Sequence, residues 1–286
     1  MIGVLVLASG SNDWLYQLLP SLSHKKIRVF VHVDNKMKLA KTLVELFPDV
    51  IFLKDRVDVF WGGFSMVDAT KRLIDKSYEY EGCIQSFCLI SDSCYPIKSI
   101  DEFVEYCEDN NKLIHMNISD AVISELHPFY DRVAYSWPMD SDSTNPKTIK
   151  DKYLADYLKY YKEKKNLDME IKVGANWMML PRCIVDSIKS KDLSVYDAQF
   201  KYSRNADEFY FQTIIHSMIQ SGELDQSNIV KNLHYSDFSK DGIIPGRPKV
   251  LDDSDLKDLL DSGKYFARKM DLRVSMKLKL MLDEKL

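Results

Sequence analysis

The sequence contains no apolar run that approaches the roughly 18 residues of a membrane-spanning helix. Its first residues carry no basic region before their apolar run, so we do not expect a signal peptide. The five cysteines are odd in number and lack the paired spacing of a metal site, which favours reduced, buried thiols. Together these absences predict a cytoplasmic protein.

Two further absences narrow the range of functions. The net charge is -4, so the chain has no overall basic field and we do not expect nucleic acid as a partner. The chain also lacks the glycine patterns of dinucleotide-binding proteins and P-loop NTPases, which cradle phosphate groups on the backbone. Neither of these nucleotide-binding classes is therefore supported.

What the sequence does contain is an alternation of strand and helix signals. Apolar or β-branched runs predict strands at residues 2–8, 27–33, 50–53, 84–91 and 112–116. Helical signals fall between them at residues 12–19, 37–47, 64–77 and 99–108. This order predicts an α/β fold with a mostly parallel central sheet and helices on both faces.

The predicted sheet also indicates where a ligand would bind. In such sheets the ligand lies beyond the carboxyl ends of the strands. Asp34, Asp92 and the loop at residues 55–63 follow strand ends, and the first strand ends in Leu7 and Ala8. We therefore expect these residues to lie near a bound ligand, with Leu7 and Ala8 against the donor of any group transfer.

The most informative segment is residues 205–213, Asn-Ala-Asp-Glu-Phe-Tyr-Phe-Gln-Thr. Apolar positions recur from Phe209 onward at near-helical spacing, which places two carboxylates at the start of a helix. We expect Asp207 to cap this helix and the helix dipole to favour the charged form of Glu208. An ionised, rigidly held carboxylate suits a general base that deprotonates a substrate hydroxyl. The alternative is a capping pair without chemistry.

Six segments, taken in order, resemble the motifs of one enzyme family. They are residues 31–36 (Val-His-Val-Asp-Asn-Lys), 61–65 (Trp-Gly-Gly-Phe-Ser), 89–99 (Leu-Ile-Ser-Asp-Ser-Cys-Tyr-Pro-Ile-Lys-Ser), 174–177 (Gly-Ala-Asn-Trp), 206–209 (Ala-Asp-Glu-Phe) and 266–271 (Phe-Ala-Arg-Lys-Met-Asp). The series resembles glycosyltransferase family 14, the core-2/I-branching β-1,6-N-acetylglucosaminyltransferases, which also includes peptide O-xylosyltransferases. The resemblance covers nearly the whole chain. Because we expect no membrane anchor and no disulfide-rich pattern, it implies a bacterial-type member.

This resemblance implies a GT-A-like, Rossmann-like fold, a UDP-sugar donor and inversion at the anomeric carbon. It implies one glycosyltransferase domain over residues 1–286. Within that domain we expect a nucleotide-sugar-binding half at 1–120, an acceptor and catalytic half at 121–271, and a basic C-terminal helix at 272–286.

The resemblance also assigns roles at the donor site. Glu208 matches the catalytic base of the family, with Ala206 in place of a proline. Asp34 matches an aspartate near the donor nucleoside, and a turn-forming role is the alternative. Trp61 matches an aromatic residue near the uridine, where it could stack on the base, and a buried core tryptophan is the alternative.

The leaving diphosphate needs positive charge near it. Most GT-A enzymes supply a metal on an Asp-x-Asp motif, but Asp92-Ser93-Cys94 lacks the second carboxylate. Family 14 branching enzymes use basic side chains instead, and Arg247 and Lys269 match them. We therefore expect no metal and no other cofactor. The formal motif Asp140-Ser141-Asp142 lies in a polar loop, where we do not expect metal binding.

Sugar and acceptor contacts follow from the same comparison. Asp92 and Cys94 are expected beside the sugar ring, and Cys94 replaces a family aspartate, which leaves the donor sugar open. The positions that match acceptor or sugar contacts are Arg132, Trp177, Tyr235 and Asp237, with core packing as the alternative for the aromatic residues. We expect transfer of N-acetylglucosamine, or else xylose or another sugar, to a glycan or lipid-linked oligosaccharide in surface-polysaccharide synthesis.

Three alternatives stay open at this point. One is a non-catalytic sugar-binding protein on a GT-A fold, and another is a nucleotidyltransferase, which would need a metal. The third concerns the tail at residues 268–281, which mixes basic and apolar residues. It could contact the inner face of an anionic membrane as a peripheral segment, or it could form a helix packed on the domain.

Overall fold

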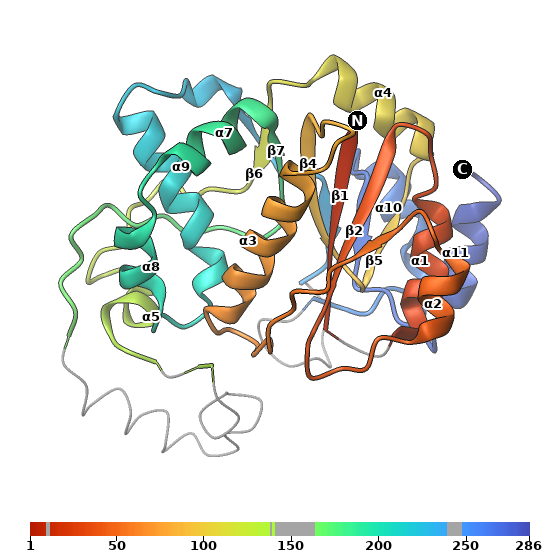
Figure 1. Cartoon of the computed structure of the whole chain (residues 1–286), viewed down its shortest axis with the longest axis horizontal. Coiled ribbons are helices and arrows are strands. Elements are labelled where there is room, and N and C mark those ends of the chain that lie inside the picture. The colour runs from red at the N-terminus through yellow and green to blue at the C-terminus, as the bar shows by residue number, and fades with distance from the viewer. Residues whose placement is uncertain (10–11, 138, 141–163, 239–247) are drawn as a thin grey trace.

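A seven-stranded sheet runs through the centre of the molecule (Figure 1). The computed structural model describes residues 1–9, 12–137, 139–140, 164–238 and 248–286. In spatial order the strands are β3 (Ile51–Phe52), β2 (Ile27–Val33), β1 (Ile2–Ala8), β4 (Ser86–Ser91), β7 (Met178–Pro181), β6 (Ile114–Met116) and β8 (Ile229–Val230).

Most neighbouring strands of this sheet are parallel. β1 pairs in parallel with both β2 and β4, and β2 pairs in parallel with β3. β7 is the exception among these pairs, because it runs antiparallel to β4 and β6, whereas β6 and β8 are parallel. The central strands are apolar and buried on both faces, as expected for parallel strands covered by helices. The predicted mostly parallel α/β sheet is confirmed.

Helices cover both faces of the sheet and enclose two hydrophobic cores. Alternation along β1 sends Val4 and Val6 into one core and Leu5 into the other. The first core is closed by α1 (Leu15–Ser21), α2 (Lys41–Leu46), α4 (Ile100–Asp109), α10 (Leu256–Asp261) and α11 (Met276–Asp283). The second core is closed by α3 (Ser65–Tyr78), α5 (Tyr130–Ala134), α7 (Arg182–Ser190), α8 (Ser194–Phe200) and α9 (Tyr210–Gln220).

A second, three-stranded sheet forms from segments that are distant in sequence. It has the order β5 (Cys94–Pro96), β10 (Phe266–Arg268) and β9 (His234–Ser236). β10 is antiparallel to β5 and parallel to β9. The sequence did not predict β5 or β10, because strands this short show no periodicity. β8 and β9 are close in sequence but belong to different sheets.

The C-terminal helix α11 packs on the domain. Leu278 and Leu282 are fully buried in the first core, and Lys277 pairs with Asp253 at 2.6 Å. These contacts agree with the packed-helix interpretation of the basic tail, and membrane contact stays a prediction. In the part of the chain that the structure describes, no helix is long and apolar enough to cross a membrane.

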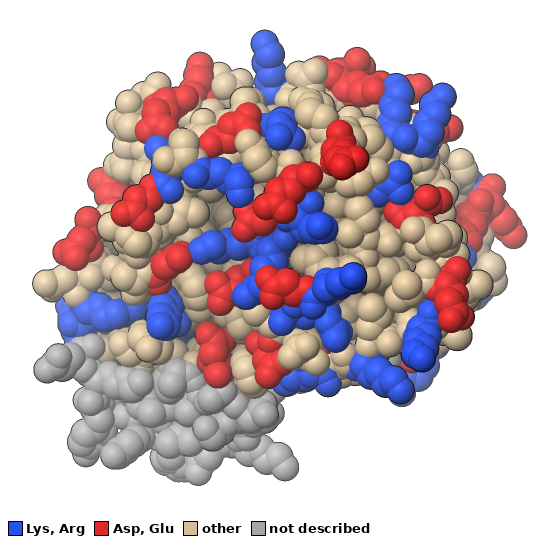
Figure 2. All heavy atoms as spheres, viewed as in Figure 1, with Lys and Arg blue, Asp and Glu red and all other residues tan. Residues whose placement is uncertain are grey.

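The face that carries α3 and α7 mixes both signs of charge. Figure 2 shows basic and acidic side chains side by side across it. Several are ion pairs: Lys71 with Asp197 at 2.9 Å, Arg72 with Asp55, and Lys189 with Asp75. Neutralisation by such pairs leaves little single-sign field on this face.

Candidate functional site

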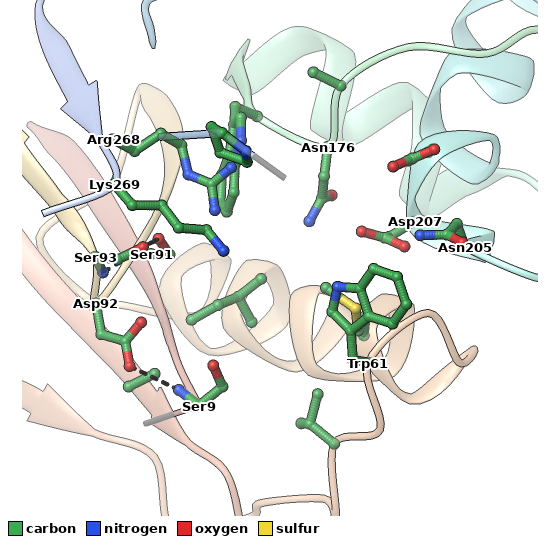
Figure 3. Close-up of a pocket in the computed structure, with 18 of the residues that line it drawn as sticks. Ser9, Trp61, Ser91, Asp92, Ser93, Asn176, Asn205, Asp207, Arg268 and Lys269 are labelled. Carbon is green, nitrogen blue, oxygen red and sulfur yellow. Dashed lines mark hydrogen bonds between the residues drawn. The ribbon is translucent and has the colours of Figure 1, made fainter. Parts of the chain in front are cut away.

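A cavity of about 270 Å³ opens beyond the carboxyl ends of β1 and β4. Parallel sheets leave their ligand sites at this edge, because the loops that follow neighbouring strands diverge there. Its lining comes from the ends of β1, β4 and β10, from the loop that precedes α3, from the segment that precedes β7, and from η2 (Ala206–Glu208), a 3-10 turn. Figure 3 shows the side chains that point into it.

The cavity brings together predicted site residues that are far apart in sequence. Those that line it are Leu7, Ala8, Trp61, Asp92, Trp177, Glu208 and Lys269. The predicted base, Glu208, and a predicted diphosphate-binding cation, Lys269, therefore line the same cavity. Their roles in donor binding and catalysis remain predictions, but the shared space is a condition that those roles require.

Glu208 is paired with an arginine. It ends η2, directly before α9, and its Oε2 accepts a hydrogen bond from Nη1 of Arg132 at 2.8 Å. Burial raises the pKa of the Glu208 carboxyl, while the positive charges of Arg132 and Arg204 oppose that rise. The sequence argument expected the charged form of Glu208 to be favoured, whereas the net shift of its pKa is upward because burial outweighs the positive charges. The predicted acceptor contact, Arg132, instead stabilises the ionised form of Glu208.

Asp207 does not cap the helix, so that prediction was wrong. The N-cap positions of η2 and α9 are Asn205 and Phe209, and Asp207 is only 6% exposed. The turn instead begins at Asn205, whose φ of 58° is in the left-handed region, and Asp207 lines the cavity. Burial first, and then the charge of Glu208, raise the pKa of Asp207 to about 7.

The pairing of Arg132 with Glu208 predicts a change in pH dependence. In Arg132→Met, the pKa of Glu208 should rise, because burial would no longer be opposed by the nearest positive charge. A general base works when deprotonated, so the acid limb of the pH–rate profile should move to higher pH. Arg132→Lys keeps the charge and should move the limb less. An unchanged limb in Arg132→Met would contradict this account of Glu208.

The opposite side of the cavity is cationic. Figure 3 shows Arg268 and Lys269 together at the end of β10, across the space from Asp207. The guanidinium of Arg268 lies 4.3 Å from the ring centroid of Trp177, within the range of a cation–π contact. Burial lowers the pKa of Arg268, and the nearby Cys94 and Asp92 oppose that shift. An arginine nevertheless stays protonated in proteins.

Arg268 is a site residue that the sequence analysis missed. The family motif at 266–271 singled out the neighbouring Lys269, and no periodicity marked β10 as a strand. The contact with the aromatic ring of Trp177 would have marked Arg268 as a site residue. Nothing in the sequence, however, predicts that these two residues lie side by side. Trp177 also packs against His234, with 5.3 Å between the ring centroids and a tilt of 32° between the ring planes.

Asp34 lies outside the cavity lining, and its carboxylate is occupied by local contacts. Its Oδ1 accepts hydrogen bonds from the backbone N–H groups of Lys36 and Val59, and its Oδ2 pairs with the Lys36 ammonium at 3.0 Å. The residue is 4% exposed. These contacts fit the alternative, turn-forming role, whereas a nucleoside contact stays a prediction.

Cys94 is not among the residues that line the cavity, and its predicted contact with the sugar ring stays a prediction. It is fully buried, and the Ser91 backbone N–H donates to its Sγ at 3.3 Å. β5 directs the side chain into the first core, where burial raises the pKa of the thiol. Asp92 does line the cavity, and its Oδ2 accepts a hydrogen bond from the backbone N–H of Ser9.

The remaining predicted residues are not part of the described cavity lining. Tyr235 packs against the first core from β9, which agrees with the core-packing alternative. Asp237 is 9% exposed, and its carbonyl oxygen accepts a hydrogen bond from the backbone of Lys249. Neither lines the cavity. Arg247 lies outside the described residues.

Asp140 has a structural role. Its two carboxylate oxygens accept hydrogen bonds from the backbone N–H groups of Phe64 and Ser65, and from the Ser65 hydroxyl, at the start of α3. The described residues contain no group of three or more His, Cys, Asp or Glu side chains that could hold a metal ion. Metal independence itself stays a prediction.

Comparison with known proteins identifies one family. A model of the Core-2/I-branching enzymes matches residues 5–260, while comparison with curated proteins finds no match. Among solved structures, a protein assigned as a glucose-1-phosphate thymidylyltransferase from Bacillus anthracis, in complex with sucrose, is 12% identical with a TM-score of 0.36, over 81% of this chain and 86% of that one. S. aureus TarS is 14% identical with a TM-score of 0.29, over 44% of this chain and 24% of that one. These remote structural likenesses carry no functional argument.

Proposed function

Because the chain belongs to the Core-2/I-branching enzyme family of glycosyltransferases, we propose that it moves a sugar from a UDP-sugar to a glycan hydroxyl, with inversion at the anomeric carbon and without a divalent metal. One observation carries the proposal: Glu208 and Lys269 line the same cavity. An inverting transfer needs a base for the acceptor alcohol and positive charge for the departing diphosphate. This cavity contains a carboxylate suited to the first role and basic side chains suited to the second.

Glu208 acts on the acceptor in this scheme. Its carboxylate takes the proton of the acceptor hydroxyl as the oxygen attacks the anomeric carbon. The bond from that carbon to the diphosphate breaks on the opposite face, which inverts the configuration. Support comes from the ion pair with Arg132, which favours the deprotonated form that a base requires.

Lys269 and Arg268 act on the leaving group. The ammonium of Lys269 places a compact charge near the diphosphate oxygens, and the guanidinium of Arg268 offers a planar pair of donors. Both residues are partly buried, which reduces the screening of these interactions by solvent. The resemblance assigns a similar role to Arg247, outside the described residues.

The donor and acceptor are proposed from the family. The donor sugar is N-acetylglucosamine, with xylose as the alternative, and Trp61 stacks on the uridine. The acceptor is a glycan or a lipid-linked oligosaccharide in surface-polysaccharide synthesis. The position of Trp61 in the cavity lining supports its part in this assignment.

A panel of UDP-sugars tests the function. The purified protein should hydrolyse or transfer UDP-N-acetylglucosamine in preference to UDP-xylose and UDP-glucose. Its rate should stay within about twofold when excess EDTA removes divalent ions, since no step is assigned to a metal. Complete loss of the rate in EDTA, with recovery in Mn²⁺, would contradict the metal-free scheme. Binding of a donor without turnover of any donor would instead favour the non-catalytic alternative.

A further inference from the structure

One wall of the cavity carries buried polar atoms that lack hydrogen-bond partners among the described residues. Asn176 is 6% exposed, and both its amide oxygen and its amide nitrogen lack a partner. The Oδ1 atom of Asp207 also lacks one. Both residues line the cavity, and Figure 3 shows their side chains directed into the space bounded by Trp61 and Lys269.

Unpaired buried polar atoms are uncommon in native proteins, because desolvating them without compensation is unfavourable. In Asn176 and Asp207 these atoms lie on the lining of the cavity, where a ligand could pair with them. The Asn176 side-chain amide has an oxygen that accepts hydrogen bonds and, beside it, an NH₂ group that can donate two. It therefore complements a ligand that offers a donor and an acceptor at neighbouring positions.

The backbone holds Asn176 in a fixed relation to the proposed base. The N–H of Gly174 donates to the carbonyl oxygen of Glu208 at 2.9 Å, and Gln212 donates to the carbonyl oxygen of Ala175 at 3.0 Å. Gly174 also allows a close approach to Asn117, since a Cβ there would lie 1.7 Å from the Asn117 carbonyl oxygen. These contacts tie the segment that carries Asn176 to both η2 and α9.

Trp177, the residue after Asn176, contacts the cationic side of the cavity. Trp177 follows directly in the chain and stacks beneath the guanidinium of Arg268. Asn176 thus lies between the residue proposed to activate the acceptor and the residues proposed to bind the diphosphate. In an inverting transfer the ring of the donor sugar occupies that interval, because its anomeric carbon is attacked from one side and released on the other.

We propose that Asn176 and Asp207 form the subsite for the transferred sugar, with the Asn176 amide bound to neighbouring ring substituents and Asp207 bound to a ring hydroxyl. The inference rests on the proposed function and deepens it. The ligand chemistry is a donor and an acceptor on adjacent ring positions, supplied either by an acetamido group with its neighbouring hydroxyl or by two hydroxyls. The raised pKa of Asp207 lets its carboxyl donate as well as accept near neutral pH.

The test compares affinities for UDP and for UDP-sugars by calorimetry. Asn176→Leu removes both hydrogen-bonding atoms and preserves much of the volume. It should weaken binding of the matching UDP-sugar by about tenfold or more relative to UDP alone, because a site built to hydrogen-bond loses discrimination when the bond is removed. A larger loss for UDP-N-acetylglucosamine than for UDP-glucose would identify an acetamido partner, and equal losses would identify two hydroxyls.

Two further variants keep the test decisive. Asn110→Leu makes the same chemical change at the C-terminal end of α4, where the amide donates to Tyr106, and should leave the affinity ratio unchanged. Asp207→Asn should lower UDP-sugar affinity yet melt at a higher temperature than the wild type above about pH 7. Folding raises the pKa of Asp207, so the wild type loses stability as pH rises from about 4 to about 7, and asparagine avoids that loss.

The outcomes separate this inference from the function on which it rests. An affinity ratio in Asn176→Leu equal to that of the wild type would overturn the sugar subsite and leave the glycosyltransferase proposal standing. A wild-type protein that binds neither UDP nor any UDP-sugar would instead overturn the proposed function.

Discussion

Glu208→Gln should lower kcat by about 10³-fold, within the range expected for loss of a general base. Glutamine has nearly the same shape and still offers an oxygen to Arg132, so the ion pair becomes a hydrogen bond and η2 should keep its fold. What glutamine cannot do is accept the proton of the acceptor hydroxyl. Affinity for the UDP-sugar should therefore change little, while transfer nearly stops.

The measurement is steady-state transfer at saturating donor and acceptor, together with donor affinity by calorimetry. Glu223→Gln is a matched control, because Glu223 is a partly exposed residue paired with Lys191 and does not line the cavity. It should leave kcat unchanged. A Glu208→Gln enzyme within about tenfold of the wild type would assign the base to another group, since general bases usually contribute more than that.

Lys269→Met should lower kcat by about 10²-fold or more, as expected when a charged group at the leaving group is lost. Methionine retains an apolar stem of similar length and removes the charge. Arg268 remains in Lys269→Met and still places a positive charge near the departing diphosphate. The decrease in kcat should therefore be smaller than for Glu208→Gln. Lys269→Arg preserves the charge and should recover part of the rate.

Transfer rates at saturating substrate check this expectation. Lys285→Met removes a lysine from the exposed C-terminal end of the chain and serves as the control. A Lys269→Met enzyme with an unchanged kcat would show that the ammonium does not compensate the departing diphosphate. A change confined to KM would show instead that Lys269 contributes equally to binding the ground state and the transition state.

The central sheet could be predicted because its strands are long enough to show their pattern. β1, β2 and β4 are continuous apolar or β-branched runs, and each is followed by a helical signal. The three-residue strands β5 and β10 carry no such pattern and form only because distant segments pair. As a consequence, the sequence could not place Arg268 at the edge of the cavity.

The side-chain environment of the site was harder to predict than its location. Glu208 and Lys269 were found through motifs, yet the stabilising role of Arg132 depends on a contact across 76 positions of the chain. Asp207 was expected at a helix cap, but a left-handed Asn205 begins a 3-10 turn and buries it. Burial and long-range pairing decide charge state, and neither is visible in a local sequence pattern.

The most direct measurement is a crystal structure of the protein with an intact UDP-sugar, grown with Mn²⁺ present. The account predicts the diphosphate within hydrogen-bond distance of Lys269 and without a bridging metal, the sugar ring against Asn176 and Asp207, and the Glu208 carboxylate on the opposite side of the anomeric carbon from the diphosphate. A diphosphate bound through Mn²⁺, or Glu208 on the same side of that carbon as the leaving group, would contradict it.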